Sequence, residues 1–289
     1  MLLSALIAQK KISRSIPIAE QLLNEPKYNY DIIDNVQKLI DSLRYTDINR
    51  AIAVAEKRLP KLIKYAEDSI GNPGHAALVL NYALDLDSMY QETGNTAKSQ
   101  AFVSSFLSQF NSSPLASNKR IKQSVDATLL RHKLIGIKAP SIEGIEYIDM
   151  PKTSIGELNG KVIMLDFLAH WCAPCIESFP ETNLLKQKYE SKGLVIVGVT
   201  NYYGFFGEQE NLPIPDELAA LKKLKLQRNA NFGFIVGPRT NEQAYGVAGL
   251  PAVVLIDRQG KVRYSKQGVG YKKEIEKIIR RLVTENITN

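Results

Sequence analysis

The sequence is poor in cysteine and histidine. Its 289 residues include two cysteines and three histidines. A structural zinc site needs about four ligands, usually with a second pair of cysteine or histidine residues. No histidine follows His170, so a copper site that pairs two cysteines with a downstream histidine is not available either. We therefore expect no bound metal and no other cofactor. Because both cysteines lie in one motif, no network of disulfides holds the fold together.

Long apolar runs and a clear targeting segment are also missing. A membrane-spanning helix requires about 20 consecutive apolar residues, and no stretch approaches that length. Residues 1–8 form a short apolar run followed by Lys10 and Lys11, whereas a secretory signal places its positive charge before the apolar core. This run is either the remnant of a trimmed leader or the first helix.

The positive charge is modest and does not indicate a nucleic-acid partner. The formal net charge is +7, which is compatible with an ordinary solvated basic surface. The lysines at residues 222–225 have no interleaved aromatic residues, although a groove for single-stranded nucleic acid uses such residues for stacking. We expect no nucleic acid to bind.

The chain is long for one domain, and its first part has a helical pattern. In residues 1–133, apolar residues recur at spacings of three and four, as one buried helix face requires. The clearest stripes are Ile32, Ile33, Val36, Leu39, Ile40 and Leu43, then Ile52, Ala55, Leu59, Leu62, Ile63 and Ala66. We predict an all-helical domain, either a bundle or hairpins like those of tetratricopeptide repeats. Its expected role is partner binding or homo-oligomerisation.

Residues 134–289 have an alternating strand and helix pattern, which begins near Pro140. Strand–helix–strand order predicts parallel neighbours, and the final hairpin predicts an antiparallel edge, so we expect an α/β domain with a mixed sheet. The main expected strands cover residues 161–169, 193–200, 232–236, 252–257 and 261–267. The main expected helices cover residues 174–192, 216–226 and 272–284.

The two cysteines, Cys172 and Cys175, stand where a predicted buried strand meets a helix start. A Cys-x-x-Cys pair in this setting is typical of a redox site. Backbone N–H groups and the positive end of a helix dipole stabilise a thiolate, which is the reactive form. We therefore predict a thiol–disulfide oxidoreductase in which Cys172 is the exposed attacking thiol. Cys175, further inside, would resolve the mixed disulfide.

Asp166 lies within an otherwise apolar predicted strand. A buried carboxylate is costly and keeps its proton to a higher pH than usual. One interpretation makes Asp166 the proton acceptor for Cys175, and the alternative is an aspartate at a strand end that reaches water. The apolar neighbours favour burial.

Several segments resemble the thioredoxin family. Residues 166–175 are similar to its active-site segment, and Pro180 matches its helix-kinking proline. Leu250 and Pro251, followed by an apolar strand, resemble the cis-proline loop, which in that family lies beside the dithiol and offers backbone groups to a substrate peptide. The resemblance implies a thioredoxin-like fold over residues 134–289, with Trp171, Leu250 and Pro251 contacting the substrate.

Two further segments resemble the TlpA-like (ResA-like) branch of that family, namely residues 136–140 and 158–162. Its members are mostly membrane-tethered or secreted reductases of bacterial cell envelopes. The resemblance implies disulfide-containing protein substrates, a membrane thiol relay as electron donor and a periplasmic or other extracytoplasmic location, with a cytoplasmic one as the alternative. The chain departs from the branch at Asp166, where asparagine is common, and at Ser178, where ResA-like reductases carry glutamate. Glu177 lies one position earlier.

Other interpretations remain open. A thiol peroxidase wants a threonine or serine three residues before the reactive cysteine, and Ala169 fills that place, so this function is disfavoured. The chain can also be a helical interaction protein with an accessory redox domain. The dipeptide Ala173–Pro174 lacks the charge or histidine of strong oxidants and favours a reductase. The aromatic loop at residues 202–207 either lines a substrate groove or, as we favour, caps the sheet edge.

Overall fold

The computed structural model describes residues 2–25, 29–68, 73–269 and 272–285. The chain divides into two compact units, Met1–Val125 and Asp126–Asn289. The division falls within the helix that leads up to residue 134, the start of the predicted α/β domain. Each unit is described by itself.

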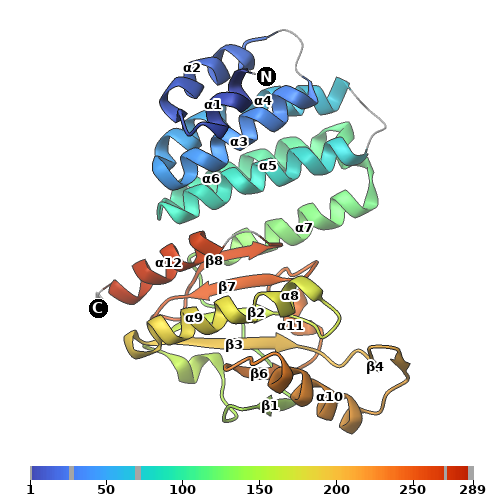
Figure 1. Cartoon of the computed structure of the whole chain (residues 1–289). Coiled ribbons are helices and arrows are strands. Elements are labelled where there is room, and N and C mark those ends of the chain that lie inside the picture. The colour runs from blue at the N-terminus through green and yellow to red at the C-terminus, as the bar shows by residue number, and fades with distance from the viewer. Residues whose placement is uncertain (1, 26–28, 69–72, 270–271, 286–289) are drawn as a thin grey trace. The chain divides into compact units, whose positions relative to one another are not determined.

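The first unit is helical, as predicted (Figure 1). Its described parts, residues 2–25, 29–68 and 73–125, contain no strand. The apolar run at the start of the chain forms the first helix. The elements are α1 (Leu2–Ala8), α2 (Ile12–Leu23), α3 (Tyr30–Thr46), α4 (Ile48–Asp68), α5 (Pro73–Glu92), α6 (Thr96–Ser112), a 3-10 turn (Pro114–Ser117) and the start of α7 (Lys119–Leu134).

These helices pack chiefly on their sequence neighbours, with α3 against α4, α4 against α5 and α5 against α6. The predicted stripe of α3 is buried except for Ile32, which is partly exposed, because the other apolar side chains share one helix face. A buried ion pair joins α3 to α5, where Arg44 contacts Asp85 at 2.7 Å and Glu92 at 3.0 Å. Ser88 accepts a further hydrogen bond from Arg44. Buried charges need such partners.

The second unit is built on a mixed six-stranded sheet in the order β1-β6-β3-β2-β7-β8. Strand β2 is parallel to β3 and antiparallel to β7, β3 is parallel to β6, and β1 and β8 are antiparallel edges. Strands β4 and β5 form a separate hairpin. The bounds are β1 (Glu146–Ile148), β2 (Val162–Phe167), β3 (Leu194–Thr200), β4 (Phe205–Phe206), β5 (Gln209–Glu210), β6 (Gly233–Val236), β7 (Ala252–Ile256) and β8 (Val262–Gln267).

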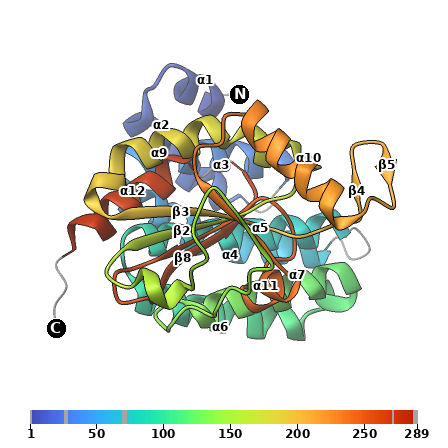
Figure 2. The same ribbon diagram turned by 90° about the horizontal axis from the view of Figure 1, so that it is seen from below.

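Helices cover both faces of this sheet (Figure 2). On one face, Phe179, Leu221 and Ile278 pack from α9, α10 and α12; on the other, Leu134 of α7 and Tyr245, just after α11, pack against the strands. The predicted α/β domain with a mixed sheet is confirmed. The helices are α8 (Ala173–Glu177), α9 (Phe179–Tyr189), α10 (Ile214–Gln227), α11 (Thr240–Ala244) and α12 (Lys272–Thr284), with 3-10 turns at Ile155–Leu158 and Glu190–Lys192.

The single helix predicted over residues 174–192 is wrong. The segment divides into α8, α9 and a 3-10 turn, with a break at Ser178. Pro180 has no backbone N–H and crowds the preceding turn. The Ser178 N–H instead donates to the carbonyls of Cys175 and Ile176, which ends α8.

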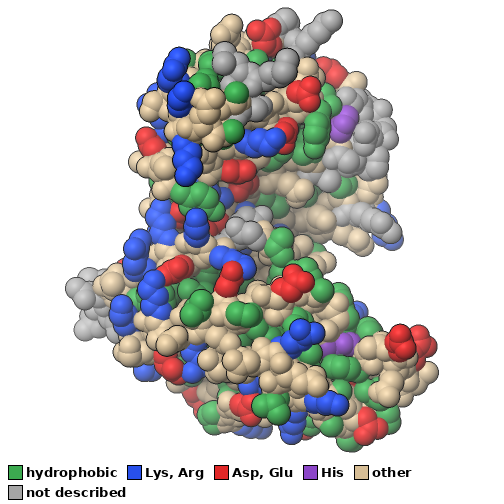
Figure 3. Space-filling model, in the orientation of Figure 1, with side chains coloured by type: hydrophobic (Ala, Val, Ile, Leu, Met, Phe, Trp, Pro, Cys, Tyr) green, Lys and Arg blue, Asp and Glu red, His purple; other side chains and the backbone are tan. Residues whose placement is uncertain are grey.

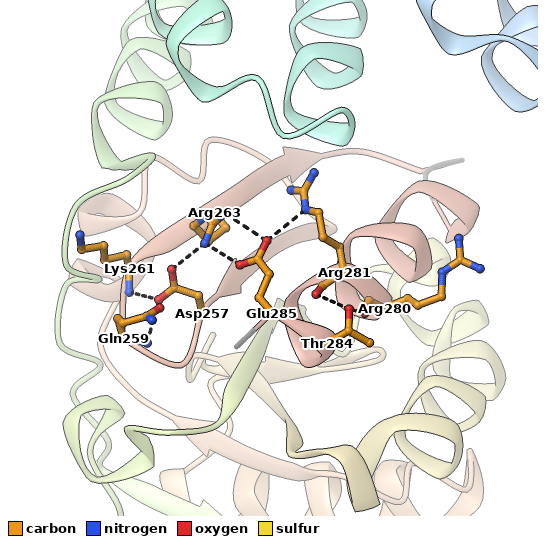
Figure 4. A network of polar contacts seen from close by, with 8 residues as sticks. All are labelled: Asp257, Gln259, Lys261, Arg263, Arg280, Arg281, Thr284 and Glu285. Carbon is orange, nitrogen blue, oxygen red and sulfur yellow. Dashed lines mark hydrogen bonds and ion pairs between the residues drawn. The ribbon is translucent and has the colours of Figure 1, made fainter. Parts of the chain in front are cut away.

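A polar network fastens the β7–β8 hairpin to the end of α12 (Figure 4). Asp257 accepts hydrogen bonds from the backbone N–H groups of Gln259 and Lys261. Arg263 forms ion pairs with both Asp257 and Glu285. The predicted hairpin turn after residue 257 is confirmed. Elsewhere on the face shown in Figure 3, basic and acidic side chains are interspersed, as on an ordinary solvated surface.

Candidate functional site

The two cysteines lie at the carboxyl end of β2 and are bonded to each other. Cys172 caps the N-terminus of α8, and Cys175 lies in its first turn. The Cys172 carbonyl accepts N–H bonds from Cys175 and Ile176, which closes this turn around the disulfide. Because the two cysteines are three residues apart, the first turn of α8 brings them together, as predicted.

The expectation that Cys172 is exposed is not met in this disulfide form. Cys172 is 5% exposed and Cys175 is 1% exposed. Both belong to the apolar cluster that contains Ala169 and Phe179, and a sulfur bonded to its neighbour stays against that cluster. Both residues are thus buried in the disulfide, and Cys172 keeps the slightly larger exposed fraction.

Trp171 and the cis-proline loop flank the disulfide. The peptide bond between Leu250 and Pro251 is cis. Phe167 of β2 pairs with Ala252 of β7 in antiparallel register, so Pro251 lies beside the segment that leads to Cys172. Trp171 keeps 49% of its surface exposed directly before Cys172. These residues therefore border the segment that carries the two cysteines.

Asp166 is buried in the centre of the sheet, so the alternative of a strand-end aspartate in water is not observed. It lies on β2 between Gly198 of β3 and Val253 of β7. Burial raises the pKa of its carboxyl group to about 7. A carboxyl group with such a pKa can exchange a proton near neutral pH.

A cavity of about 1120 Å³ connects Asp166 with the active-site segment. Asp166, Pro174 and Pro251 line it together with side chains of α9 and α12, including Leu184 and Ile275. The sequence did not predict this cavity, because it depends on how two distant helices pack against the sheet. It offers a route by which Asp166 can reach solvent.

Glu177 and Ser178 also line this cavity. Ser178 stands where ResA-like reductases carry glutamate, and it has no carboxyl group. The Glu177 side chain is exposed. The Ser178 hydroxyl donates to the Cys175 carbonyl at 2.6 Å, a bond within the helix turn. Among the described residues, no group of three or more His, Cys, Asp and Glu side chains is placed to hold a metal ion.

The aromatic loop lies against the active-site segment, a placement that sequence reasoning did not favour. Because β2 and β3 are parallel neighbours, the loops that follow them emerge at the same edge of the sheet. The Trp171 ring meets the Tyr203 ring edge-on at 5.5 Å. His170 packs on the same loop, and Glu217 of α10 fastens it. His170 and Glu217 were missed, since no local pattern marks residues that meet across such sequence distances.

The mixed sheet and the paired cysteines define a thioredoxin-fold protein with a disulfide where β2 leads into α8. The model of the redoxin family matches residues 135–279, about half of the chain. The chain belongs to this family, as a TlpA/ResA-like member of the thioredoxin superfamily.

The chain is similar to several named proteins. The thiol-disulfide oxidoreductase ResA of Bacillus thuringiensis subsp. konkukian is 27% identical over 149 residues, which cover 51% of this chain and 78% of the relative. The thioredoxin-like protein YneN of Bacillus subtilis is 24% identical over 141 residues, covering 49% of this chain and 76% of YneN. A solved structure of a putative thiol:disulfide interchange protein DsbE from Chlorobium tepidum is 30% identical, covers 51% of this chain and 97% of its own, and has a TM-score of 0.41.

The protein is thus a thiol–disulfide oxidoreductase, and the Cys172–Cys175 pair is its disulfide. None of the helices within the described ranges combines the length and the apolar character that crossing a bilayer needs.

Proposed function

We propose that this protein reduces disulfides of other proteins with the Cys172–Cys175 dithiol. The observation that carries the proposal is the placement of this pair at a strand-to-helix junction, beside the cis-Pro251 loop. The intervening residues Ala173 and Pro174 supply no charge that would stabilise the reduced thiolate strongly. A less stabilised thiolate makes the dithiol the better electron donor.

The proposed reaction transfers two electrons to the client. In the reduced protein, the Cys172 thiolate attacks one sulfur of the client disulfide, forms a mixed disulfide and releases one client thiolate, which takes up a proton. Cys175, deprotonated, then attacks the Cys172 sulfur. This step forms the Cys172–Cys175 disulfide seen here and releases the second client thiolate. The client disulfide is reduced and the protein dithiol is oxidised.

Asp166 is proposed to accept the proton of Cys175 in the second step. Burial raises the pKa of its carboxyl group to about 7, so a fraction of the protein carries the ionised form at neutral pH. Proton acceptors work best with a pKa near the working pH. The cavity lined by Asp166 and Pro174 lets the proton pass on to water afterwards.

We propose a periplasmic or other extracytoplasmic location in the cell envelope, with a membrane thiol relay as electron donor. The likeness to the ResA branch supports this proposal. Each catalytic cycle leaves the protein oxidised, so a donor dithiol must return two electrons by the reverse exchange. Trapping of mixed disulfides in living cells tests this part. We expect the protein's cysteines to be found attached to a membrane thiol protein.

Two measurements test the reductase. Cys175→Ser should trap Cys172 in a mixed disulfide with an insulin chain, whereas Cys172→Ser should trap none. A redox titration should place the reduction potential nearer to thioredoxin, about −270 mV, than to the oxidant DsbA, about −120 mV. A potential near the oxidant value would contradict the direction of electron flow. Peroxide turnover as fast as insulin reduction would favour the thiol peroxidase instead.

We also propose that residues 1–133 form a domain that binds a partner or a second copy, separate from the redox domain at residues 134–289. The extent of the helical unit supports this proposal, since it far exceeds a linker. Light scattering of the full chain tests for a homo-oligomer. A domain of residues 134–289 that reduces insulin normally but loses a captured partner would support the binding role.

A further inference from the structure

The aromatic loop after β3 is built onto the dithiol segment by one histidine. The His170 side chain is only 2% exposed. Its ring stacks on Phe206 at 4.5 Å and 21°, and it meets the edges of Phe205 at 5.0 Å and Tyr203 at 5.5 Å. His170 therefore ties three aromatic residues of the loop to a position two residues before Cys172.

A buried glutamate holds the same loop from the other side. Glu217 of α10 is fully buried, and each of its carboxylate oxygens accepts one backbone N–H, from Tyr203 at 2.7 Å and from Gly204 at 2.9 Å. Hydrogen bonds to a charged acceptor are stronger than those between neutral groups. Nε2 of His170 lies 4.0 Å from this carboxylate. The backbone at the start of the loop is thereby fixed.

Tyr203 connects the fixed loop to Trp171. Its hydroxyl accepts a bond from Asn201, and the Arg239 guanidinium lies 5.7 Å from its ring centre. The Trp171 ring then rests edge-on against the Tyr203 ring at 83°. Trp171 is half exposed, and the rings of Phe205 and Phe206 are partly exposed. An aromatic surface therefore continues from the residue before Cys172 onto the loop.

We propose that this aromatic surface, made by Trp171, Tyr203, Phe205 and Phe206, binds an apolar or aromatic side chain next to the disulfide of a protein client. His170 and Glu217 are positioning residues that hold the surface in place. The proposal rests on the proposed reductase function and names the feature of the client that it selects. The occupant follows from position: Trp171 directly precedes Cys172 and its ring contacts Tyr203, so residues next to a client cystine at Cys172 come close to these rings.

The test compares two substrates in the full-length protein. Insulin supplies a protein disulfide with apolar neighbours, and 5,5′-dithiobis(2-nitrobenzoate) is a small disulfide that cannot cover the loop. Glu217→Gln keeps the shape of the side chain but replaces one acceptor by an amide nitrogen. We expect kcat/KM for insulin to fall about fivefold more than kcat/KM for the small disulfide, mainly through KM; such a ratio corresponds to about 1 kcal/mol of binding.

Trp171 provides a second readout that a general loss of stability would not mimic. It is the only tryptophan in the chain, so its fluorescence reports this surface alone. In folded Glu217→Gln, acrylamide should quench Trp171 more strongly than in the unchanged protein. Leu226→Ala is the matched control, because Leu226 lies on the same helix and is 82% exposed. This control should leave both substrates and the quenching unchanged.

Phe206→Ala carries the test if Glu217→Gln does not fold, since Phe206 is only partly buried. Equal losses for both substrates, or no change for either, in a folded variant would overturn the proposal. Failure of the reductase function looks different: the unchanged protein would then reduce neither substrate, whatever the quenching of Trp171 shows.

Discussion

Asp166 of β2 lies directly opposite Gly198 of β3 in parallel register, on the sheet face that α9 and α12 cover. The carboxyl group is therefore flanked by strands on both sides. On the helical side it borders the cavity that α9 and α12 also line. The glycine opposite leaves room for Phe234 and Leu168, which come close to the place of a side chain at residue 198.

Replacing Asp166 by asparagine should change how stability depends on pH. Burial raises the pKa of the folded carboxyl group to about 7, against about 4 in an unfolded chain. Between these values the folded state binds more protons, so the free energy of unfolding falls as pH rises from about 4 to about 7 and then levels off. The full effect is on the order of 4 kcal/mol.

Urea unfolding of the oxidised protein at pH 5 and pH 8, followed by Trp171 fluorescence, measures this effect. The difference between the two pH values should shift in Asp166→Asn, because asparagine does not titrate. Asp216→Asn, at an exposed aspartate of the same unit, is the control. An unchanged pH dependence in Asp166→Asn would show that the carboxyl group does not titrate in this range.

Gly198→Ala should destabilise the sheet. A Cβ atom built at residue 198 would lie 2.6 Å from the ring of Phe234 and 3.1 Å from the Leu168 side chain. Such overpacking typically costs about 1–3 kcal/mol. Urea midpoints measured by Trp171 fluorescence give the loss. Gly156→Ala is the control, since a Cβ atom there would meet only the Ser154 hydroxyl at 3.8 Å; equal midpoints for the two variants would refute the packing argument.

Removing Arg44 from the buried ion pair of the helical unit should strongly lower the free energy of unfolding. Arg44→Ala would leave Asp85 and Glu92 without the guanidinium that pairs with them. Removing one partner of a buried pair costs about 3–5 kcal/mol. Circular dichroism during thermal unfolding should show a clear loss. Lys57→Ala breaks an exposed pair with Glu20 and should cost at most about 1 kcal/mol, so similar losses in both variants would contradict the prediction.

His170 should make the redox unit less stable at acidic pH. Burial lowers the pKa of its imidazole, against the opposing effects of the Glu217 charge and the bond to the Phe205 backbone. The unfolded imidazole titrates near 6.5, so the folded state binds fewer protons below that pH. The stability present above pH ~6.5 is then lost as pH falls towards the folded pKa.

This effect opposes that of Asp166 over part of the range, so it is measured as a difference. Urea unfolding of His170→Phe and of the unchanged protein at pH 5 and pH 7.5 should show a smaller acid loss, or a larger acid gain, in the variant. Phenylalanine keeps a flat ring against Phe206 but carries no titrating group. Parallel pH dependences would mean that His170 keeps its ordinary pKa.

Local residue patterns were enough to predict the parts of the protein that depend on short sequence distances. Cys172 and Cys175 are separated by one helical turn, so their spacing alone brings the sulfur atoms together. The apolar run of β2 predicts a strand buried on both faces, and the spacing on α12 predicts one buried face. The mixed sheet follows from the order of such elements.

The sequence by itself determined the dithiol, its strand-to-helix setting and the division into helical and α/β parts. Only the tertiary structure decided that Cys172 is buried in its disulfide, that Asp166 opens into a cavity, and that His170 and Glu217 hold an aromatic loop beside Trp171. The physical reason is sequence separation: His170 and Phe206 meet only because two parallel strands bring their following loops to one edge of the sheet. No spacing within either segment encodes that contact.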